Sequence, residues 1–129
     1  MKKNFLIVNA NYYNDISKGL LNSALKLIPK KSKVKIINVP GVFEIPVTIS
    51  KNLKKFNGFI ALGCVIKGQT PHFDFISKAT TDAIMTLSFI SKKPIGNGVI
   101  TCLNMKQAKA RKKKGAEAMN AVLSVLSQK

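Results

Sequence analysis

Residues 59–74 have the sequence FIALGCVIKGQTPHFD, in which an apolar run leads into a turn containing Gly68 and Pro71 and then into a helical pattern. Such an uninterrupted apolar run is typical of a strand that is buried on both faces of a parallel sheet. In open α/β sheets, ligands bind at the carboxyl ends of the strands, where helix N-termini present unpaired N–H groups to anions. This stretch therefore predicts a binding site at the turn.

The turn ends at His72, the only histidine of the chain. A lone histidine is more often structural than catalytic, but an imidazole titrates near neutral pH and this one stands beside a candidate anion site. Because Gly68, Thr70 and Pro71 crowd the same turn, we expect His72 to act as a general acid/base.

Strand-like and helical patterns alternate along the rest of the chain. The expected strands are residues 4–10, 34–39, 59–66 and 95–101, and the expected helices are residues 16–28 and 46–55, the segment after His72 and the C-terminal region, which breaks near residues 111–115. This alternation predicts an α/β fold with a short parallel sheet and right-handed crossover connections. With 129 residues, we expect a single domain, residues 1–129, that buries a sizeable core.

The charge of the chain is strongly positive, with 22 Lys and Arg against five Asp and Glu and a formal net charge of +17. Basic side chains neutralise phosphates, so binding to nucleic acid is one hypothesis. However, all but one of the basic residues are lysines, whereas base recognition depends on arginine and aromatic side chains. We therefore expect a solvated basic surface and no specific nucleic-acid partner.

The sequence also bears on the compartment. No apolar run approaches the roughly 18 residues of a membrane-spanning helix, and no cleavage site of small residues follows the N-terminus. We expect a cytoplasmic protein with no membrane partner. Cys64 and Cys102 have neither the spacing of metal ligands nor the density of a disulfide scaffold. We expect both to be small buried apolar side chains, and we expect no metal site.

Four motifs stand out along the chain. The more specific ones are PGVFEIP at residues 40–46 and LGCVIKGQTPHFD at 62–74, and the weaker ones are GVIT at 98–101 and NMKQA at 104–108. Together they resemble the lumazine synthase family. The resemblance covers nearly the whole chain and implies a flavodoxin-like three-layer sandwich, with a four-stranded parallel sheet flanked by helices. It also implies a homopentamer with active sites between neighbouring subunits.

The activity that the resemblance implies belongs to riboflavin biosynthesis. The family condenses 5-amino-6-(D-ribitylamino)uracil with 3,4-dihydroxy-2-butanone 4-phosphate to 6,7-dimethyl-8-ribityllumazine and releases phosphate. The resemblance implies no cofactor, and it makes riboflavin synthase a candidate partner. A non-catalytic flavin- or lumazine-binding protein of the same fold is the alternative.

The resemblance further implies a pyrimidine site. Tyr12 would stack on the pyrimidine ring, although a ring in a surface turn is also explained by packing. Phe43 and Glu44 would line the ribityl and pyrimidine site, and Glu44 is equally suited to the first turn of a helix. Val65 and Ile66 would offer backbone groups to the pyrimidine edge. Further implied contacts come from Val42 and Cys64.

A phosphate site follows in the same way. Gly68, Gln69 and Thr70 would hold the phosphate through N–H and hydroxyl donors. Arg111, the only arginine, would clamp the phosphate from a neighbouring subunit, although an arginine at a helix end is most often a surface charge. Lys114 would correspond to a second basic residue of the family.

The chain departs from the family pattern at three places. The segment between Arg111 and Lys114 is several residues shorter, and a loss of phosphate binding there would favour the non-catalytic alternative. Asn97, a further implied substrate contact, stands where the family often has an aromatic side chain. The arm that adds to a neighbour's sheet in many relatives is missing or very short, so we expect a free pentamer rather than a shell.

Overall fold

Four parallel strands form the centre of the molecule. They are β1 (Asn4–Ala10), β2 (Lys33–Val39), β3 (Gly58–Ile66) and β4 (Ile95–Cys102). In the computed structural model, which describes residues 2–128, the strands pair in the order β2-β1-β3-β4 and every pairing is parallel. All carboxyl ends of the strands therefore meet at one edge of the sheet.

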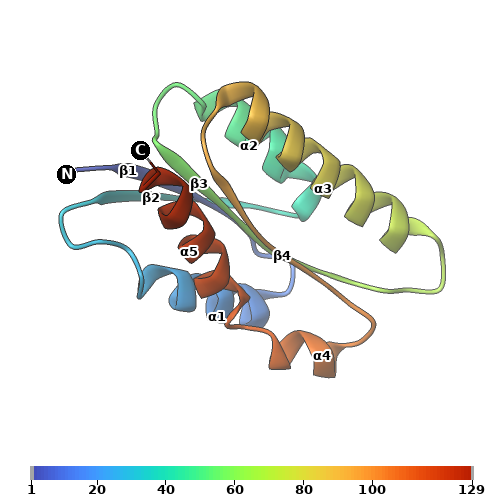
Figure 1. Cartoon of the computed structure of the whole chain (residues 1–129). Helices are drawn as coiled ribbons and strands as arrows, with labels where there is room; N and C mark the ends of the chain where they lie inside the picture. The colour runs from blue at the N-terminus through green and yellow to red at the C-terminus, as the bar shows by residue number, and fades with distance from the viewer. Residues whose placement is uncertain (1, 129) are drawn as a thin grey trace.

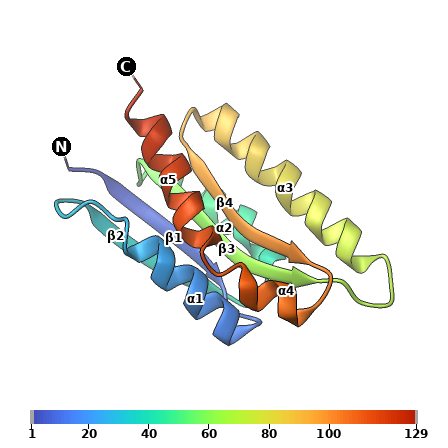
Figure 2. The ribbon, with the colours of Figure 1, turned by 60° about the horizontal axis from the view of Figure 1, so that its bottom comes forward.

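Helices cover both faces of this sheet (Figure 1). They are α1 (Asn14–Leu25), the short 3-10 helix η1 (Val42–Glu44), α2 (Ile45–Asn52), α3 (His72–Ser91), α4 (Met105–Ala110) and α5 (Lys114–Leu126). Helices α1 and α5 pack on one face and α2 and α3 on the other, as a second view also shows (Figure 2). The predicted three-layer α/β architecture with a four-stranded parallel sheet is confirmed.

The alternation of side chains along β1 explains why the sheet is covered twice. Phe5 and Ile7 join the core beneath α1 and α5, whereas Leu6 and Val8 join the core beneath α2 and α3. All of these side chains are fully buried, and β3 is buried over almost its whole length. Burying each such side chain stabilises the fold by roughly 1.5–3 kcal/mol, so the two central strands anchor both layers.

Proline explains the end of the first helix and is compatible with the start of the second. The first helix was expected to run to residue 28 but ends at Leu25, and residues 26–28 continue as a turn with bonds such as Leu27 N to Ala24 O. Pro29 disfavours a helical conformation at the residue before it, which accounts for the early end. The second helix was expected over residues 46–55, and α2 spans Ile45–Asn52. Pro46 lies in its first turn, where a backbone N–H would have no intrahelical partner in any case.

The C-terminal region contains the expected break. Helix α4 ends at Ala110, and α5 begins at Lys114 after a short turn. Among residues 2–128, no helix is both long and apolar enough to cross a membrane.

Candidate active site

A cavity of about 340 Å³ lies at the carboxyl ends of β1, β2 and β3, and we call it the aromatic pocket. Its walls come from the turn after β1, from η1, from the end of β3 and from the first helical turns of α3. The lining residues are Tyr12, Tyr13, Gly41, Val42, Phe43, Cys64, Val65, Ile66, His72 and Ile76. The structure thus brings His72 together with the expected pyrimidine contacts, except for Glu44.

Two adjacent tyrosines form one wall of the aromatic pocket. Their rings meet edge to face, with centroids 4.9 Å apart and an interplanar angle of 83°. The Tyr12 side chain is 76% exposed, which leaves a ring face free to stack on a flat ligand. Sequence reasoning missed Tyr13, because the family resemblance drew attention to its neighbour alone. Burial raises the pKa of Tyr13 above its ordinary value, so its hydroxyl is neutral near pH 7 and can donate a hydrogen bond.

Cys64 also lines the aromatic pocket. Burial, together with the nearby Cys102 thiol, raises the pKa of Cys64 to about 12. Only a thiolate is an effective nucleophile, so this side chain is chemically inert near neutral pH. Both cysteines are free and buried, as the sequence predicts.

His72 is the first residue of α3 and is exposed at the mouth of the aromatic pocket. Its backbone N–H donates to the Thr70 hydroxyl at 3.4 Å, which ties the helix start to the preceding turn. Gly68, Gln69 and Thr70 are exposed in that turn and lie outside the lining of the aromatic pocket.

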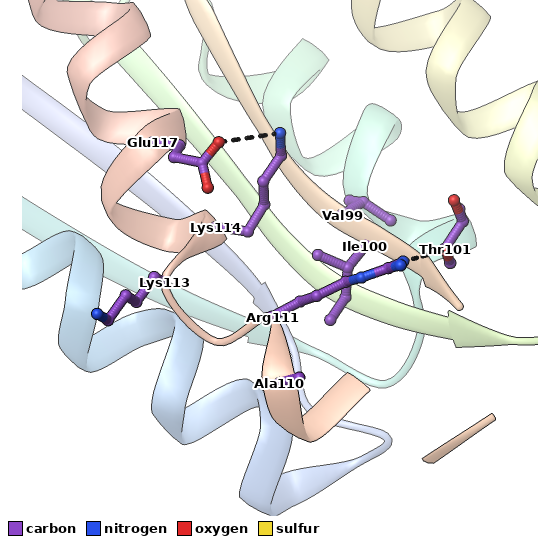
Figure 3. Close-up of a pocket in the computed structure, with 8 residues that line it drawn as sticks. All are labelled: Val99, Ile100, Thr101, Ala110, Arg111, Lys113, Lys114 and Glu117. Atoms are coloured by element: carbon purple, nitrogen blue, oxygen red, sulfur yellow. Dashed lines mark hydrogen bonds and ion pairs between the residues drawn. The ribbon is translucent and has the colours of Figure 1, made fainter. Parts of the chain in front are cut away.

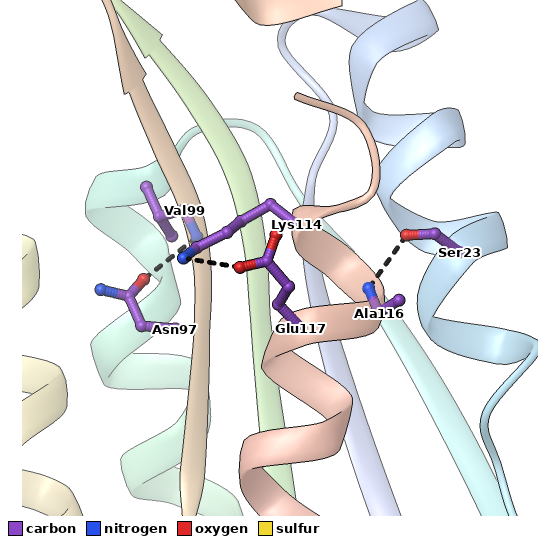
Figure 4. Close-up of polar contacts among 6 residues, drawn as sticks. All are labelled: Ser23, Asn97, Val99, Lys114, Ala116 and Glu117. Atoms are coloured by element: carbon purple, nitrogen blue, oxygen red, sulfur yellow. Dashed lines mark hydrogen bonds and ion pairs between the residues drawn. The ribbon is translucent and has the colours of Figure 1, made fainter. Parts of the chain in front are cut away.

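Two other predicted site residues line neither this pocket nor the cationic pocket described next. Glu44 lies where η1 meets α2, and its carbonyl oxygen accepts a hydrogen bond from the Thr48 hydroxyl at 2.8 Å. Asn97 is exposed on the edge strand β4, where its side-chain oxygen accepts from the backbone N–H of Val99 at 3.0 Å (Figure 4).

A second cavity, of about 590 Å³, lies beside the carboxyl half of β4, and we call it the cationic pocket (Figure 3). It is lined by Val99, Ile100, Thr101, Ala110, Arg111, Lys113, Lys114 and Glu117. The Arg111 guanidinium donates to the Thr101 carbonyl oxygen at 3.5 Å, and the Lys114 ammonium lies 3.5 Å from the Glu117 carboxylate. Three cations against one carboxylate make this cavity suited to an anion.

Capping of α4 helps to place Arg111. The Asn104 side chain accepts from the N–H of Gln107 at 2.9 Å, and the Gln107 side chain accepts from the N–H of Leu103 at 2.8 Å. These bonds satisfy N–H groups at the helix start and fix the direction in which the chain leaves β4. The NMKQA motif therefore has a structural explanation in addition to the family resemblance. Arg111 follows directly after α4 and ends it.

The aromatic and cationic pockets have no lining residue in common. Within one chain, Arg111 and Lys114 therefore line a different cavity from His72. Within residues 2–128, no cluster of three or more His, Cys, Asp or Glu side chains is placed to hold a metal ion.

The strand order and the position of the aromatic pocket define a class. The order β2-β1-β3-β4 corresponds to the first four strands of a flavodoxin-like sheet, in which ligands bind at the carboxyl ends of the strands. The molecule is thus a flavodoxin-like α/β protein with a site for a small molecule. The family model described as 6,7-dimethyl-8-ribityllumazine synthase matches residues 2–129, and the chain belongs to this family.

Individual relatives agree with the family match. A 6,7-dimethyl-8-ribityllumazine synthase of Bartonella bacilliformis is 43% identical over 85% of this chain and 76% of the relative. Proteins of the same name are 40% identical in Bartonella henselae, over 99% of this chain and 89% of the relative, and 38% identical in Agrobacterium fabrum, over 99% and 95%.

Family membership confirms the resemblance seen in the sequence. The activity of the family is that of a transferase of riboflavin biosynthesis, and the matches do not favour the non-catalytic alternative. Membership also indicates small-molecule substrates and an oligomeric assembly.

Proposed function

We propose that this chain condenses 5-amino-6-(D-ribitylamino)uracil with 3,4-dihydroxy-2-butanone 4-phosphate in the aromatic pocket. The observation that carries the proposal is that one cavity at the strand ends contains both an exposed aromatic ring, Tyr12, and the only imidazole of the chain, His72. The ring suits a flat pyrimidine, and the imidazole suits proton transfer at the amine beside it.

The pyrimidine lies, on this proposal, against Tyr12 with its polar edge toward the backbone of Val65 and Ile66 at the end of β3. A strand end is a rigid platform, so its N–H and C=O groups are already oriented for the ring. Phe43 and Glu44 lie in η1, directly before α2, and suit the ribityl chain, because a carboxylate can accept hydrogen bonds from several hydroxyls.

The phosphate of the second substrate binds at the Gly68–Thr70 turn, next to the N-terminus of α3. A Cβ placed on Gly68 would meet no atom within 4 Å, and no glycine among the described residues has a positive φ. Neither packing nor backbone conformation therefore requires glycine here. The absence of a side chain at Gly68 instead lets a phosphate approach the backbone N–H groups of the turn.

Proton transfer is the main chemical task of His72. Imine formation, phosphate elimination, ring closure and loss of water each move protons, and a positioned imidazole contributes on the order of 10²-fold to 10⁴-fold in rate. Holding two reactants together supplies much of the remaining acceleration, because the condensation is bimolecular. No cofactor takes part in these steps.

Assembly brings the two pockets together: Arg111 of one subunit clamps the phosphate bound by its neighbour. The exposed apolar side chains on α3 support a subunit interface, since a 20-residue helix here buries only Thr80 and Ile84. The large exposed side chains on this helix are Phe75, Met85, Phe89 and Ile90. We propose a cytoplasmic homopentamer in which residues 1–129 form a single domain.

The direct test is incubation of the purified protein with both substrates while the absorbance of the lumazine chromophore is followed. We expect product only when both substrates are present and phosphate release in equal amount. A protein that binds the pyrimidine yet forms no product would contradict the proposal and support the non-catalytic alternative.

A mixing experiment tests the shared site. We expect His72→Ala and Arg111→Ala each to be impaired alone. The two variants are then unfolded and refolded together in equal amounts. A site is intact when one subunit supplies His72 and its neighbour supplies Arg111, so random mixing around a ring restores about a quarter of the sites. No recovery in mixed oligomers would place both residues in the site of one chain.

A further inference from the structure

The turn that carries the cationic pocket is electrostatically unfavourable. Four successive basic residues, 111–114, stand at the start of α5. The N-terminus of a helix is the positive end of its dipole and disfavours nearby cations. Lys113, at the N-cap position of α5, makes no side-chain cap bond, and Glu117 is paired only with Lys114. Contacts from elsewhere in the fold must therefore hold this turn in place.

Ser23, on α1, supplies such a contact (Figure 4). Its hydroxyl oxygen accepts from the backbone N–H of Ala116 at 3.0 Å, a donor that is shared with the Lys113 carbonyl oxygen at 3.0 Å. Ala116 is the third residue of α5. In helices that have a serine at the N-cap, the serine side chain accepts a hydrogen bond from the N–H at this position. A serine of a neighbouring helix therefore caps α5 in place of Lys113.

The same hydroxyl also holds the turn itself. Its hydrogen can be donated to the Lys112 carbonyl oxygen at 2.9 Å or to the Leu20 carbonyl oxygen of its own helix at 3.0 Å. A bond to Lys112 fixes the residue next to Arg111, and the bond to Ala116 fixes the other end of the basic run.

Close packing of α1 against α5 leaves Ser23 little freedom. A Cβ on Gly115 would collide with the Leu20 carbonyl oxygen and would lie 2.6 Å from the Ser23 hydroxyl oxygen. Gly115 is buried, and the side chain of Lys112 lies against Gly19. Glycine on both helices thus allows the contact distance at which one serine hydroxyl reaches both ends of the turn.

We propose that Ser23 is a positioning residue for the cationic pocket: by capping α5 from α1, it fixes where Arg111 and Lys114 present their charges to the substrate phosphate. This role rests on the proposed function. The Ser23 hydroxyl replaces a cap that the short, positively charged turn at residues 111–114 does not supply to α5. Ser23 touches neither reactant.

Kinetics of a Ser23→Ala variant test the proposal. Loss of the cap raises KM for the butanone phosphate by roughly threefold to tenfold, the effect of one lost hydrogen bond to backbone. KM for the pyrimidine stays unchanged, because the aromatic pocket has no lining residue from α5. The matched control is Ser88→Ala, which removes a partly buried serine hydroxyl that donates to the Lys93 carbonyl oxygen, at 3.1 Å, just beyond the end of α3.

Hydrogen exchange of residues 111–117 adds a readout that does not need activity. We expect the Ala116 amide to exchange faster in Ser23→Ala than in wild type and in Ser88→Ala. Unchanged exchange there, or an equal rise in both KM values with a loss of thermal stability that the control does not show, would overturn the positioning role. A wild-type protein that forms no product would contradict the proposed function, while the exchange data would still decide whether Ser23 holds the turn.

Discussion

The aromatic and cationic pockets differ in how the chain builds them. The aromatic pocket is lined by the end of a buried strand and by the residues that follow two others, so its walls are fixed by the core of the sheet. The cationic pocket is carried by one turn between α4 and α5, with long basic side chains whose positions depend on how α5 packs against α1. The lining of the first pocket suits recognition by shape, and the lining of the second suits recognition by charge.

This difference separates two kinds of binding energy. Stacking on an aromatic ring contributes about 0.5–1.5 kcal/mol beyond burial and tolerates small changes of the ring that stacks. A paired set of charged hydrogen bonds to a phosphate contributes more but depends strictly on geometry. Substitutions in the two pockets should therefore affect different substrates and different kinetic constants.

The largest effect is expected from His72→Ala. Turnover should fall by roughly 10²-fold or less, at or below the low end of what a positioned imidazole contributes, because water can partly replace imidazole in these proton transfers. The fold should be retained, since His72 is exposed at the start of α3. Steady-state turnover and circular dichroism check both statements, and full activity of this variant would remove His72 from the mechanism.

Arg111→Lys should act on the cationic pocket alone. A lysine ammonium keeps the charge but cannot form two parallel hydrogen bonds to a phosphate, so kcat/KM for the butanone phosphate should fall about tenfold to thirtyfold. Affinity for the pyrimidine should barely change. Lys109→Arg, an equally charge-neutral exchange at an exposed position of α4, is the control.

Steady-state kinetics with each substrate varied decide the outcome. If KM and turnover for the butanone phosphate are unchanged in Arg111→Lys, the Gly68–Thr70 turn alone holds the phosphate. The cationic pocket would then have no role in binding the phosphate, although it would still be a cavity distinct from the aromatic pocket.

A smaller effect is expected at Tyr12. Tyr12→Ala should weaken pyrimidine binding by roughly threefold to tenfold, whereas Tyr12→Phe should be nearly silent, because stacking needs the ring and not the hydroxyl. Pyrimidine titration followed by absorbance measures both, and the Phe variant serves as the control. If Phe is as harmful as Ala, the hydroxyl of Tyr12 takes part in binding.

The sequence predicted the aromatic pocket better than the cationic one for a physical reason. Apolar runs such as residues 59–66 specify buried strands, and the ends of parallel strands must meet, so the surroundings of His72 followed from local patterns. The cap on α5 did not, because Ser23 and Ala116 are 93 residues apart and no local pattern joins them. Tyr13 was missed because the family resemblance points only to its neighbour Tyr12, and no local pattern shows that Tyr13 packs, partly buried, against the core beneath α1.

The smallest effect concerns Cys64, and it is visible only in the pH dependence of stability. Burial raises the pKa of the folded thiol to about 12 from its ordinary value of 9.0, so between these values the folded state holds a proton that the unfolded state has released. This contribution to stability is therefore complete below pH 9.0 and is lost as the pH rises toward about 12. Between pH 8 and pH 10 the wild type should lose about 1 kcal/mol more of its free energy of unfolding than Cys64→Ala, as measured by urea titration.

Both KM values near pH 7 should agree within about twofold between the two proteins, because an inert thiol takes no part in the chemistry. A large loss of turnover in Cys64→Ala at neutral pH, with pyrimidine binding intact, would show instead that this wall of the aromatic pocket has a chemical role.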